Sequence, residues 1–439
     1  MKKAEIVFIP SSGIGHLIPT IHFAKTLQSH THAHAHLSIT ILTLPTPSPN
    51  SPIPPGLTDS VLPRFRFIQL TSTDLVHRTL SGLIAESAHN SVPLAALVVD
   101  MFTTEFVHVA CQLGLPSYVY YTSGASMLRL ALKCPTLDSE IDSDFIDHEP
   151  GEFDIPSFRN SVPVVAVPSV IWRKGGDHYA WFIDHSRRLE EAKGIIVNSF
   201  YDLEPYAIDS LRVYSAGPVL DLVGRVADAD NDKIMKWLDK QPARSVVFLC
   251  FGSKGTFEAA QAKEVARGLE RSGYRFLWAV RPTNGSTRLE ELVHDGFLER
   301  TVERGLVVCG GWVPQVAVLS HGSVGCFVSH CGWNSILESV WFGVPILTWP
   351  MHAEQRLNAF LLVKELGLSV ELKGYHRVAD ELITADEVER GLKSVMEGEW
   401  DEVRKRVGEM KEKSRRAVVE GGSSFESMKR FIEDLIGGQ

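Results

Sequence analysis

A histidine that directly follows the first apolar run is the first residue with possible chemistry. Ser11-Ser12-Gly13-Ile14-Gly15-His16 follows the apolar residues 4–9, and a G-x-G turn after a strand is part of a dinucleotide fingerprint. The third glycine of that fingerprint is absent. Thr43-Leu44-Pro45 also stands where an NAD-binding protein has an acid at the end of its second strand. These departures argue against NAD binding. What remains is a tight turn that presents His16 at the edge of a sheet where the strands end.

A carboxylate ends another apolar run, at Val98-Val99-Asp100. An aspartate there is often a helix cap. The carboxyl ends of parallel strands share one edge of a sheet, however, so Asp100 is expected within reach of His16. A carboxylate on one imidazole nitrogen holds the tautomer and raises the basicity of the other nitrogen. The pair therefore predicts a general base that accepts a proton from a substrate hydroxyl.

The stretch 312–355 combines several residues suited to a nucleotide sugar. It is typical of a strand end, a short helix, a strand, and a helix that opens at His330-Cys331-Gly332-Trp333-Asn334-Ser335. Gly332 permits close approach of a ligand to the backbone. The N–H groups and side chains of Asn334 and Ser335 at a helix N-terminus suit a diphosphate, to which His330 adds a donor.

Other residues of this stretch suit the rest of such a ligand. Trp312 offers a flat face to a uracil ring. Glu338, one turn into the helix, can accept hydrogen bonds from ribose hydroxyls, and the acid–amide pair Glu354 and Gln355 can bind sugar hydroxyls. Any one of these residues also has an ordinary core or cap role, but the whole set in this order favours a nucleotide-sugar site.

From Trp312 to Gln355 the chain resembles the signature box of plant family-1 UDP-glycosyltransferases, and the resemblance extends over essentially all 439 residues. It implies an α/β protein of the GT-B fold, in which two Rossmann-like, doubly wound domains face each other across a cleft. The expected division is an acceptor-binding domain over 1–220, a UDP-sugar-binding domain over 221–420, and a C-terminal helix within 421–439 that crosses back to the first domain.

The resemblance also assigns roles to residues. His16 matches the general base and Asp100 its partner. Gln355 usually goes with glucose, and Trp333, rather than Arg, argues against glucuronic acid. Val313 stands where the family usually has Ala, which a backbone contact tolerates. The expected UDP-sugar-binding set is Ser253, Trp312, Val313, Gln315, His330, Trp333, Asn334, Ser335, Glu338, Glu354, Gln355 and Thr122; the expected acceptor neighbours are Gly13, Phe102 and His352.

The expected function is thus an inverting, UDP-glucose-dependent O-glucosyltransferase. Its expected acceptor is small, apolar, hydroxylated and phenolic, of the flavonoid or phenylpropanoid kind. The alternatives are a terpenoid or hormone acceptor for the same chemistry, or a nucleotide-sugar binding protein without catalysis. The pair His16 and Asp100 argues against a binding protein. The expected donor is a co-substrate, and no cofactor or metal is expected.

Composition narrows the class of protein further. The net charge of −9 argues against a nucleic-acid partner, because phosphate backbones require a basic face. The six cysteines form no C-x-x-C pair and are expected to be reduced. Apolar runs fall short of the roughly 18 residues that a membrane span needs. A cytoplasmic, monomeric protein without a membrane anchor is expected.

Alternating apolar runs and helical patterns supply the elements that position these residues. The expected strands cover 4–9, 37–44, 65–70, 95–99 and 117–121, then 245–251, 275–280, 306–309, 326–329, 345–348 and 368–371. Such alternation predicts parallel sheets with helices on both faces. The first helix is expected over 17–28, and the linker between domains over 215–232.

Three further patterns allow other chemistry. Asp142-Ser143-Asp144 and Asp228-Ala229-Asp230 match the D-x-D pattern that holds a metal in other glycosyltransferase folds, but both lie in polar loops. His30, His32, His34 and His36 alternate and can share one face of an extended segment, although a variable loop is the simpler interpretation. Cys331 next to His330 can suggest a thiol nucleophile, although neighbouring side chains point in different directions.

Overall fold

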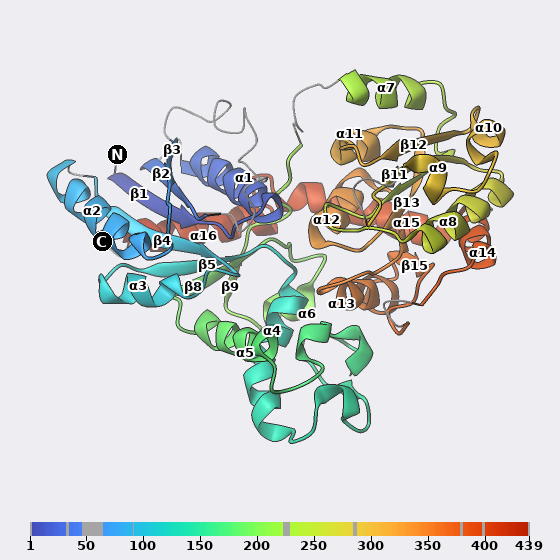
Figure 1. Cartoon of the computed structure of the whole chain (residues 1–439). Helices are drawn as coiled ribbons and strands as arrows, with labels where there is room; N and C mark the ends of the chain where they lie inside the picture. The colour runs from blue at the N-terminus through green and yellow to red at the C-terminus, as the bar shows by residue number, and fades with distance from the viewer. Residues whose placement is uncertain are drawn as a thin grey trace.

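The computed structural model describes residues 2–31, 35–45, 65–90, 92–222, 229–283, 288–377, 381–396 and 400–437. Two α/β halves lie side by side, each built on its own sheet (Figure 1). The two sheets fall on either side of residue 220, where the sequence predicts the division. Within the described ranges, no helix is long and apolar enough to cross a membrane.

The sheet of the N-terminal half has seven parallel strands in the order β3-β2-β1-β4-β5-β8-β9. Its central strands are apolar almost throughout because helices cover both faces. The strands are β1 (Lys2–Ile9), β2 (Ala35–Thr43), β3 (Phe65–Gln69), β4 (Leu94–Asp100), β5 (Ser117–Tyr121), β8 (Gly194–Val197) and β9 (Val213–Ser215).

The helices of this half follow the strands closely. They are α1 (Ile14–Thr31), α2 (Leu75–Asn90), α3 (Phe106–Gln112), α4 (Ala125–Glu140), α5 (Asp177–Leu189) and α6 (Pro205–Asp209). Between α4 and α5 the chain makes an excursion with the antiparallel pair β6 (Glu152–Phe153) and β7 (Val162–Pro163), together with three short 3₁₀ helices. This excursion projects below the rest of the half in Figure 1.

The sheet of the C-terminal half has six parallel strands in the order β12-β11-β10-β13-β14-β15. They are β10 (Val246–Cys250), β11 (Arg275–Val280), β12 (Gly305–Cys309), β13 (Val324–Ser329), β14 (Ile346–Thr348) and β15 (Ser369–Glu371). The helices around them are α7 (Ala229–Leu238), α8 (Ala259–Ser272), α9 (Leu289–Leu292), α10 (Phe297–Thr301), α11 (Gln315–Ser320), α12 (Trp333–Phe342), α13 (Gln355–Phe360) with a π turn over Leu361–Glu365, α14 (Ala385–Met396) and α15 (Asp401–Ala417).

The last helix, α16 (Ser423–Gly437), packs under the N-terminal sheet and not against the half from which it comes (Figure 1). Its Phe431 lies against the rings of Phe23, Tyr118 and Tyr214. The hydroxyl of Ser427 also accepts a hydrogen bond from the backbone N–H of Ser215, at 2.9 Å. The apolar stripe of α16 thus joins the core of the N-terminal half.

The expected strands are all present to within about two residues, whereas β8 and β9 were not predicted. Runs of four and three residues are too short to be told from loop by periodicity. The first helix begins at Ile14 and not at residue 17, because the carbonyl of Gly13 already accepts the N–H of Leu17 at 3.0 Å. His16 therefore lies in the first turn of α1. His32 and His34, most of the loop 45–55 and the linker residues 223–228 lie outside the described residues.

Candidate functional site

The ends of three neighbouring strands bring His16 and its partners together. His16 follows β1, Asp100 ends β4, and Thr122 follows β5. Nδ1 of His16 lies 3.0 Å from Oδ2 of Asp100 and 3.2 Å from Oγ1 of Thr122. The predicted contact between His16 and Asp100 is present, and Nε2 is the ring nitrogen left for a substrate.

Asp100 is buried and held rigidly. Its Oδ1 accepts the backbone N–H of Phe102 at 3.0 Å, and its own N–H donates to the hydroxyl of Thr103 at 2.9 Å. That hydroxyl in turn donates to the carbonyl of Ile9, at 2.8 Å, at the end of β1. The turn after β4 is thus fixed to the end of β1, the strand that precedes His16, so the two side chains keep one geometry.

The surroundings make His16 a stronger base. Burial opposes the charged ring, but the charge and hydrogen bond of Asp100, helped by the charge of Glu354, outweigh burial, and the pKa of His16 is raised above 6.5. A raised pKa favours the imidazolium that forms when the ring accepts a proton. His16 and Asp100 can therefore act as a general base.

A cleft of about 660 Å³ lies between the two halves, next to His16. The N-terminal half contributes Gly15, Ile18, Pro19 and His22 of its first helical segment, together with residues 219–222. From the C-terminal half, the predicted donor residues that line it are Ser253, Trp312, Val313, Gln315, His330, Trp333, Asn334, Ser335 and Glu338.

The N-terminus of α12 and His330 form the anion-binding part of this cleft. The ring of His330 fits between two glycines: a Cβ at Gly252 would lie 2.7 Å from Nε2, and one at Gly332 would lie 2.5 Å from it. Burial, with the nearby His352, lowers the pKa of His330 to about 4. The ring is neutral at pH 7 and can donate one hydrogen bond, while the helix N-terminus supplies further N–H donors.

Trp312 also lines the cleft and is 44% exposed. Arg281, which follows β11, lies over this ring with its guanidinium carbon 5.7 Å from the centroid. Arg281 also donates to the carbonyl of Gly252 at 3.0 Å. Arg281 therefore links Trp312, the residue predicted to stack on the uracil ring, to the loop that carries Ser253. Arg281 was not predicted, although a cation at the end of an apolar strand was a usable indication.

Glu338 is held by an amide from the neighbouring helix. Nε2 of Gln315 donates to Oε2 of Glu338 at 2.6 Å and to the hydroxyl of Ser335 at 2.8 Å. Burial raises the pKa of Glu338 to about 7, against the effect of this hydrogen bond. The second carboxylate oxygen is available as an acceptor, which suits ribose hydroxyls. Val313 is buried, so its backbone is the part suited to contact a ligand.

Glu354 and Gln355 lie at the start of α13, and the charge of Glu354 acts on His16. Ser123, next to Thr122, donates to Oε1 of Glu354 at 3.4 Å. Oε1 of Gln355 accepts the N–H groups of Met351 and His352 at 2.9 and 3.0 Å, so its amide nitrogen remains for a ligand. Glu354 from one half thus contacts the segment of the other half that carries Thr122, a neighbour of His16.

The indole of Trp333 makes a contact between the two halves. Its Nε1 donates to the carbonyl of Asn198 in the N-terminal half, at 2.7 Å, and the side chain is buried. That side chain is engaged across the interface between the halves, and the expectation that Trp333 helps to hold the sugar stays a prediction. The backbone of Trp333 remains at the helix N-terminus.

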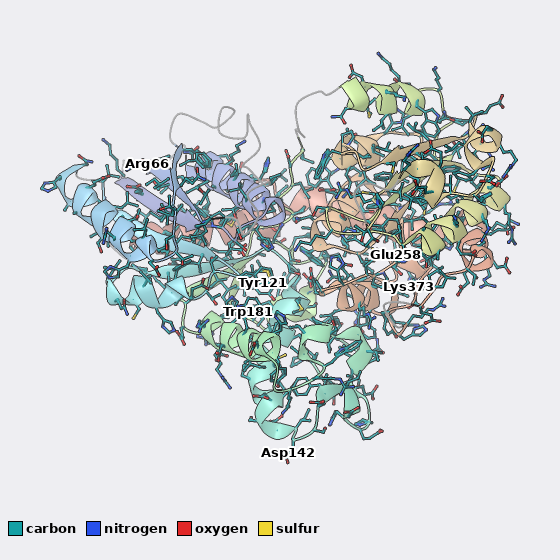
Figure 2. The ribbon with its side chains drawn as sticks, in the orientation of Figure 1. Arg66, Tyr121, Asp142, Trp181, Glu258 and Lys373 are labelled. Atoms are coloured by element: carbon teal, nitrogen blue, oxygen red, sulfur yellow. The ribbon has the colours of Figure 1, made fainter. Side chains whose placement is uncertain are left out.

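Two exposed aromatic side chains adjoin the base on the side of the N-terminal half. The ring centroid of Phe102 is 5.0 Å from that of His16, and Trp181 of α5 is 5.7 Å from Phe102. Both side chains are exposed by about two fifths (38% and 42%). Figure 2 shows Trp181 near the middle of the molecule. Trp181 was not predicted, because its helix was not recognised from the sequence.

The acceptor roles expected of Gly13, Phe102 and His352 stay predictions. Gly13 has φ of 141° in the turn before α1, and its carbonyl begins the helix. His352 is exposed beside the donor cleft and has its pKa lowered by burial and by Lys254. Of the three, Phe102 lies in direct ring contact with His16.

The structure argues against the other chemistry that the sequence allowed. Burial raises the pKa of Cys331 to about 12, and its thiol donates to the carbonyl of Ser329, so it is no nucleophile. Asp142 lies at the far tip of the N-terminal half (Figure 2), and Asp144 accepts hydrogen bonds from Lys174 and Arg173. Among the residues that the structure describes, no group of three or more His, Cys, Asp or Glu is placed to hold a metal. Asp228 lies outside them.

Comparisons with known proteins point to one family. The model of the family described as UDP-glucoronosyl and UDP-glucosyl transferase matches residues 184–408. UDP-glycosyltransferase 71K2 of Pyrus communis is 41% identical over 100% of this chain and 99% of its own. A putative UDP-glucose flavonoid 3-O-glucosyltransferase of Fragaria ananassa is also 41% identical, over 99% of this chain and 100% of its own.

A solved structure agrees. The chain is similar to UGT71G1 of Medicago truncatula complexed with UDP-glucose, with a TM-score of 0.86, 40% identity and 99% of each chain covered. This likeness confirms the GT-B fold that the signature box implied.

Proposed function

The chain belongs to the plant family-1 UDP-glycosyltransferases, and we propose that it transfers glucose from UDP-glucose to a hydroxyl of a small phenolic acceptor, with inversion at the anomeric carbon. The observation that carries this proposal is the placement of His16. Its Nδ1 is bound to Asp100, and the neighbouring Gly15 lines a nucleotide-sized cleft that the N-terminus of α12 also lines. A base on one side and an anion site on the other suit a direct displacement.

The reaction then needs one step. Nε2 of His16 takes the proton of the acceptor hydroxyl while its oxygen bonds to the anomeric carbon. The bond between that carbon and the diphosphate oxygen breaks, and UDP leaves with the negative charge. N–H groups at the start of α12, the hydroxyl of Ser335 and the neutral ring of His330 stabilise the charge as it develops. Asp100 stabilises the imidazolium.

Two features support glucose as the sugar. Gln355 keeps its amide nitrogen as a donor, and Glu354 is an acceptor beside it, which together suit neighbouring sugar hydroxyls. The relative from Fragaria ananassa carries UDP-glucose in its name, and the solved structure from Medicago truncatula holds it.

The support for a phenolic acceptor comes from Phe102 and Trp181. Two exposed aromatic rings within ring contact of each other, one of them against the base, suit a flat apolar acceptor that stacks. The relative from Fragaria ananassa is named for flavonoids.

The test is a screen of phenolic aglycones with UDP-glucose, read by the mass increase of one hexose. His16→Ala should lose turnover yet bind UDP as the native chain does, whereas His77→Ala, on the exposed face of α2, should change neither. A chain that binds UDP but glucosylates no phenol would contradict the proposal. For the sugar, Gln355→Glu removes the amide donor and should lower kcat/KM for UDP-glucose roughly tenfold or more.

The matched control for the sugar test is Gln261→Glu. Gln261 likewise accepts a backbone N–H, that of Ile383 at 2.8 Å, but lies on α8 away from the cleft. It should leave kcat/KM unchanged. Faster turnover with UDP-galactose or UDP-glucuronate than with UDP-glucose in the native chain would overturn glucose as the donor sugar.

A further inference from the structure

Glu204 is a buried carboxylate that the proposed reaction does not use. It lies just before α6 and is 3% exposed. Its Oε2 accepts the N–H of Ala125 and its Oε1 that of Ser126, both at 2.8 Å, and the hydroxyl of Ser199 donates to it as well. These backbone groups are the first N–H groups of α4, whose N-cap residue Gly124 has no side chain to bind them. Glu204 therefore caps α4 from outside the helix.

The segment that this cap holds contacts the site directly. Thr122 and Ser123 immediately precede the first turn of α4. Thr122 lies 3.2 Å from Nδ1 of His16, and Ser123 donates to Glu354 of the opposite half. A displacement of the N-terminus of α4 therefore moves residues that touch both the base and the sugar-binding pair.

The donor half contacts the same cluster through Trp333. A Cβ added to Gly124 would lie 2.8 Å from Cη2 of Trp333 and 3.0 Å from Oε1 of Glu204. The indole N–H of Trp333 is bound to the carbonyl of Asn198, the residue before Ser199. Trp333 itself begins α12, the helix proposed to hold the diphosphate. Glu204, Gly124 and Trp333 thus form one packed contact between the two halves.

We infer that Glu204 is a positioning residue: by capping α4 it holds Thr122 and Ser123 in register with Trp333, and so sets the distance between His16 and the donor. The inference rests on the proposed function. A misplacement of about 1 Å between reacting groups can cost roughly a hundredfold in rate, so a residue with no contact to substrate can still control turnover.

The test compares Glu204→Gln with Glu264→Gln. Glutamine keeps the size of Glu204 but loses the charge, and its amide group faces an N–H that needs an acceptor. We expect kcat to fall roughly tenfold to a hundredfold, with KM for UDP-glucose within about twofold of the native value. Glu264 also caps a helix from outside, accepting the N–H of Ala385 at 2.7 Å at the start of α14. It lies far from the cleft, so Glu264→Gln should lower thermal stability and leave kcat unchanged.

A second pair of variants tests the contact between the halves. Trp333→Phe keeps a ring on Gly124 but loses the hydrogen bond to Asn198. If the cluster acts as a unit, the double variant with Glu204→Gln should lose less than the product of the two single losses. Should Glu204→Gln fail to fold, Ser199→Ala removes one donor to the same carboxylate and should lower kcat by a smaller factor.

The outcomes separate cleanly. A loss of stability in Glu204→Gln equal to that of Glu264→Gln, with native kcat, overturns the positioning role. Fully multiplicative losses in the double variant also overturn it. Each variant is measured on a donor and acceptor pair that the native chain turns over, so a failure of the proposed function shows in the native chain alone and is not confused with a failure of this inference.

Discussion

Oδ2 of Asp100 lies 3.0 Å from Nδ1 of His16, although 84 residues separate them in the chain. The contact exists because β1 and β4 are neighbours in one parallel sheet, with Ile9 paired to Val99 in the register. Parallel pairing brings the carboxyl ends of both strands to the same edge. Most of the proposed chemistry depends on this relationship.

Asp100→Asn should lower kcat by roughly two to four orders of magnitude, the range that a positioned acid–base group contributes. Asparagine can still accept the N–H of Phe102, so the turn should survive, but the imidazolium loses its counter-ion. Steady-state kinetics with UDP-glucose and a glucosylated phenol give the measurement. Asp144→Asn is the control, since Asp144 also accepts a backbone N–H, that of Lys174, and should leave kcat native. A native rate in Asp100→Asn would refute the role of Asp100.

The pH dependence of kcat/KM should report the base. A ring that must accept a proton is inactive when already protonated, and the pKa of His16 is raised above 6.5 by Asp100 and Glu354 against burial. Activity should therefore rise with pH through an apparent pKa above 6.5. Glu354→Gln removes one of the negative charges that raise the pKa of His16, so the rise in activity should occur at lower pH. An apparent pKa below 6.5 for the rise in kcat/KM of the native chain would contradict the prediction. The acceptor should carry a phenol that does not ionise in the range studied.

Donor affinity should weaken as the pH falls through about 7. The pKa of Glu338 is raised to about 7 by burial, so the carboxylate becomes neutral below that pH and accepts hydrogen bonds less strongly. A hydrogen bond to a charged group is worth about 1.5–3 kcal/mol, which is roughly tenfold to a hundredfold in Kd. Calorimetric titration with UDP-glucose measures this Kd. UDP-glucose is used because, unlike UDP, it has no terminal phosphate whose ionisation would add a pH dependence of its own. Glu338→Gln should bind more weakly at pH 8 and lose the pH dependence. A pH-dependent Kd that persists in this variant would place its cause elsewhere.

Trp181→Ala should raise KM for the acceptor and leave KM for UDP-glucose unchanged. An aromatic contact adds about 0.5–1.5 kcal/mol beyond burial, or roughly a threefold to tenfold change. The loss should be larger for a flat phenol than for an aliphatic alcohol. Tyr201→Ala is the control, because Tyr201 is also 42% exposed but makes no ring contact near His16 among the described residues. Equal losses for aromatic and aliphatic acceptors would show that Trp181 does not stack on the substrate.

The sequence alone determined the class of fold and most of the donor site. Parallel strands buried on both faces leave unbroken apolar runs, so strands such as β5 and β11 can be read directly. The predicted donor residues are close in sequence because one helix N-terminus and its flanking turns carry most of them. The shared edge of a parallel sheet also made the meeting of His16 and Asp100 predictable.

Only the tertiary structure decided which side chains make contacts between the two halves. Trp333 follows the expected motif, yet its indole is bound to Asn198, because its direction is set by packing across the interface. Glu204 and Trp181 became visible once β8, α5 and α6 were placed. Those elements are short or irregular in pattern, and their side chains act through contacts between distant segments. Local periodicity carries no information about such contacts, whereas the packing of one half against the other does.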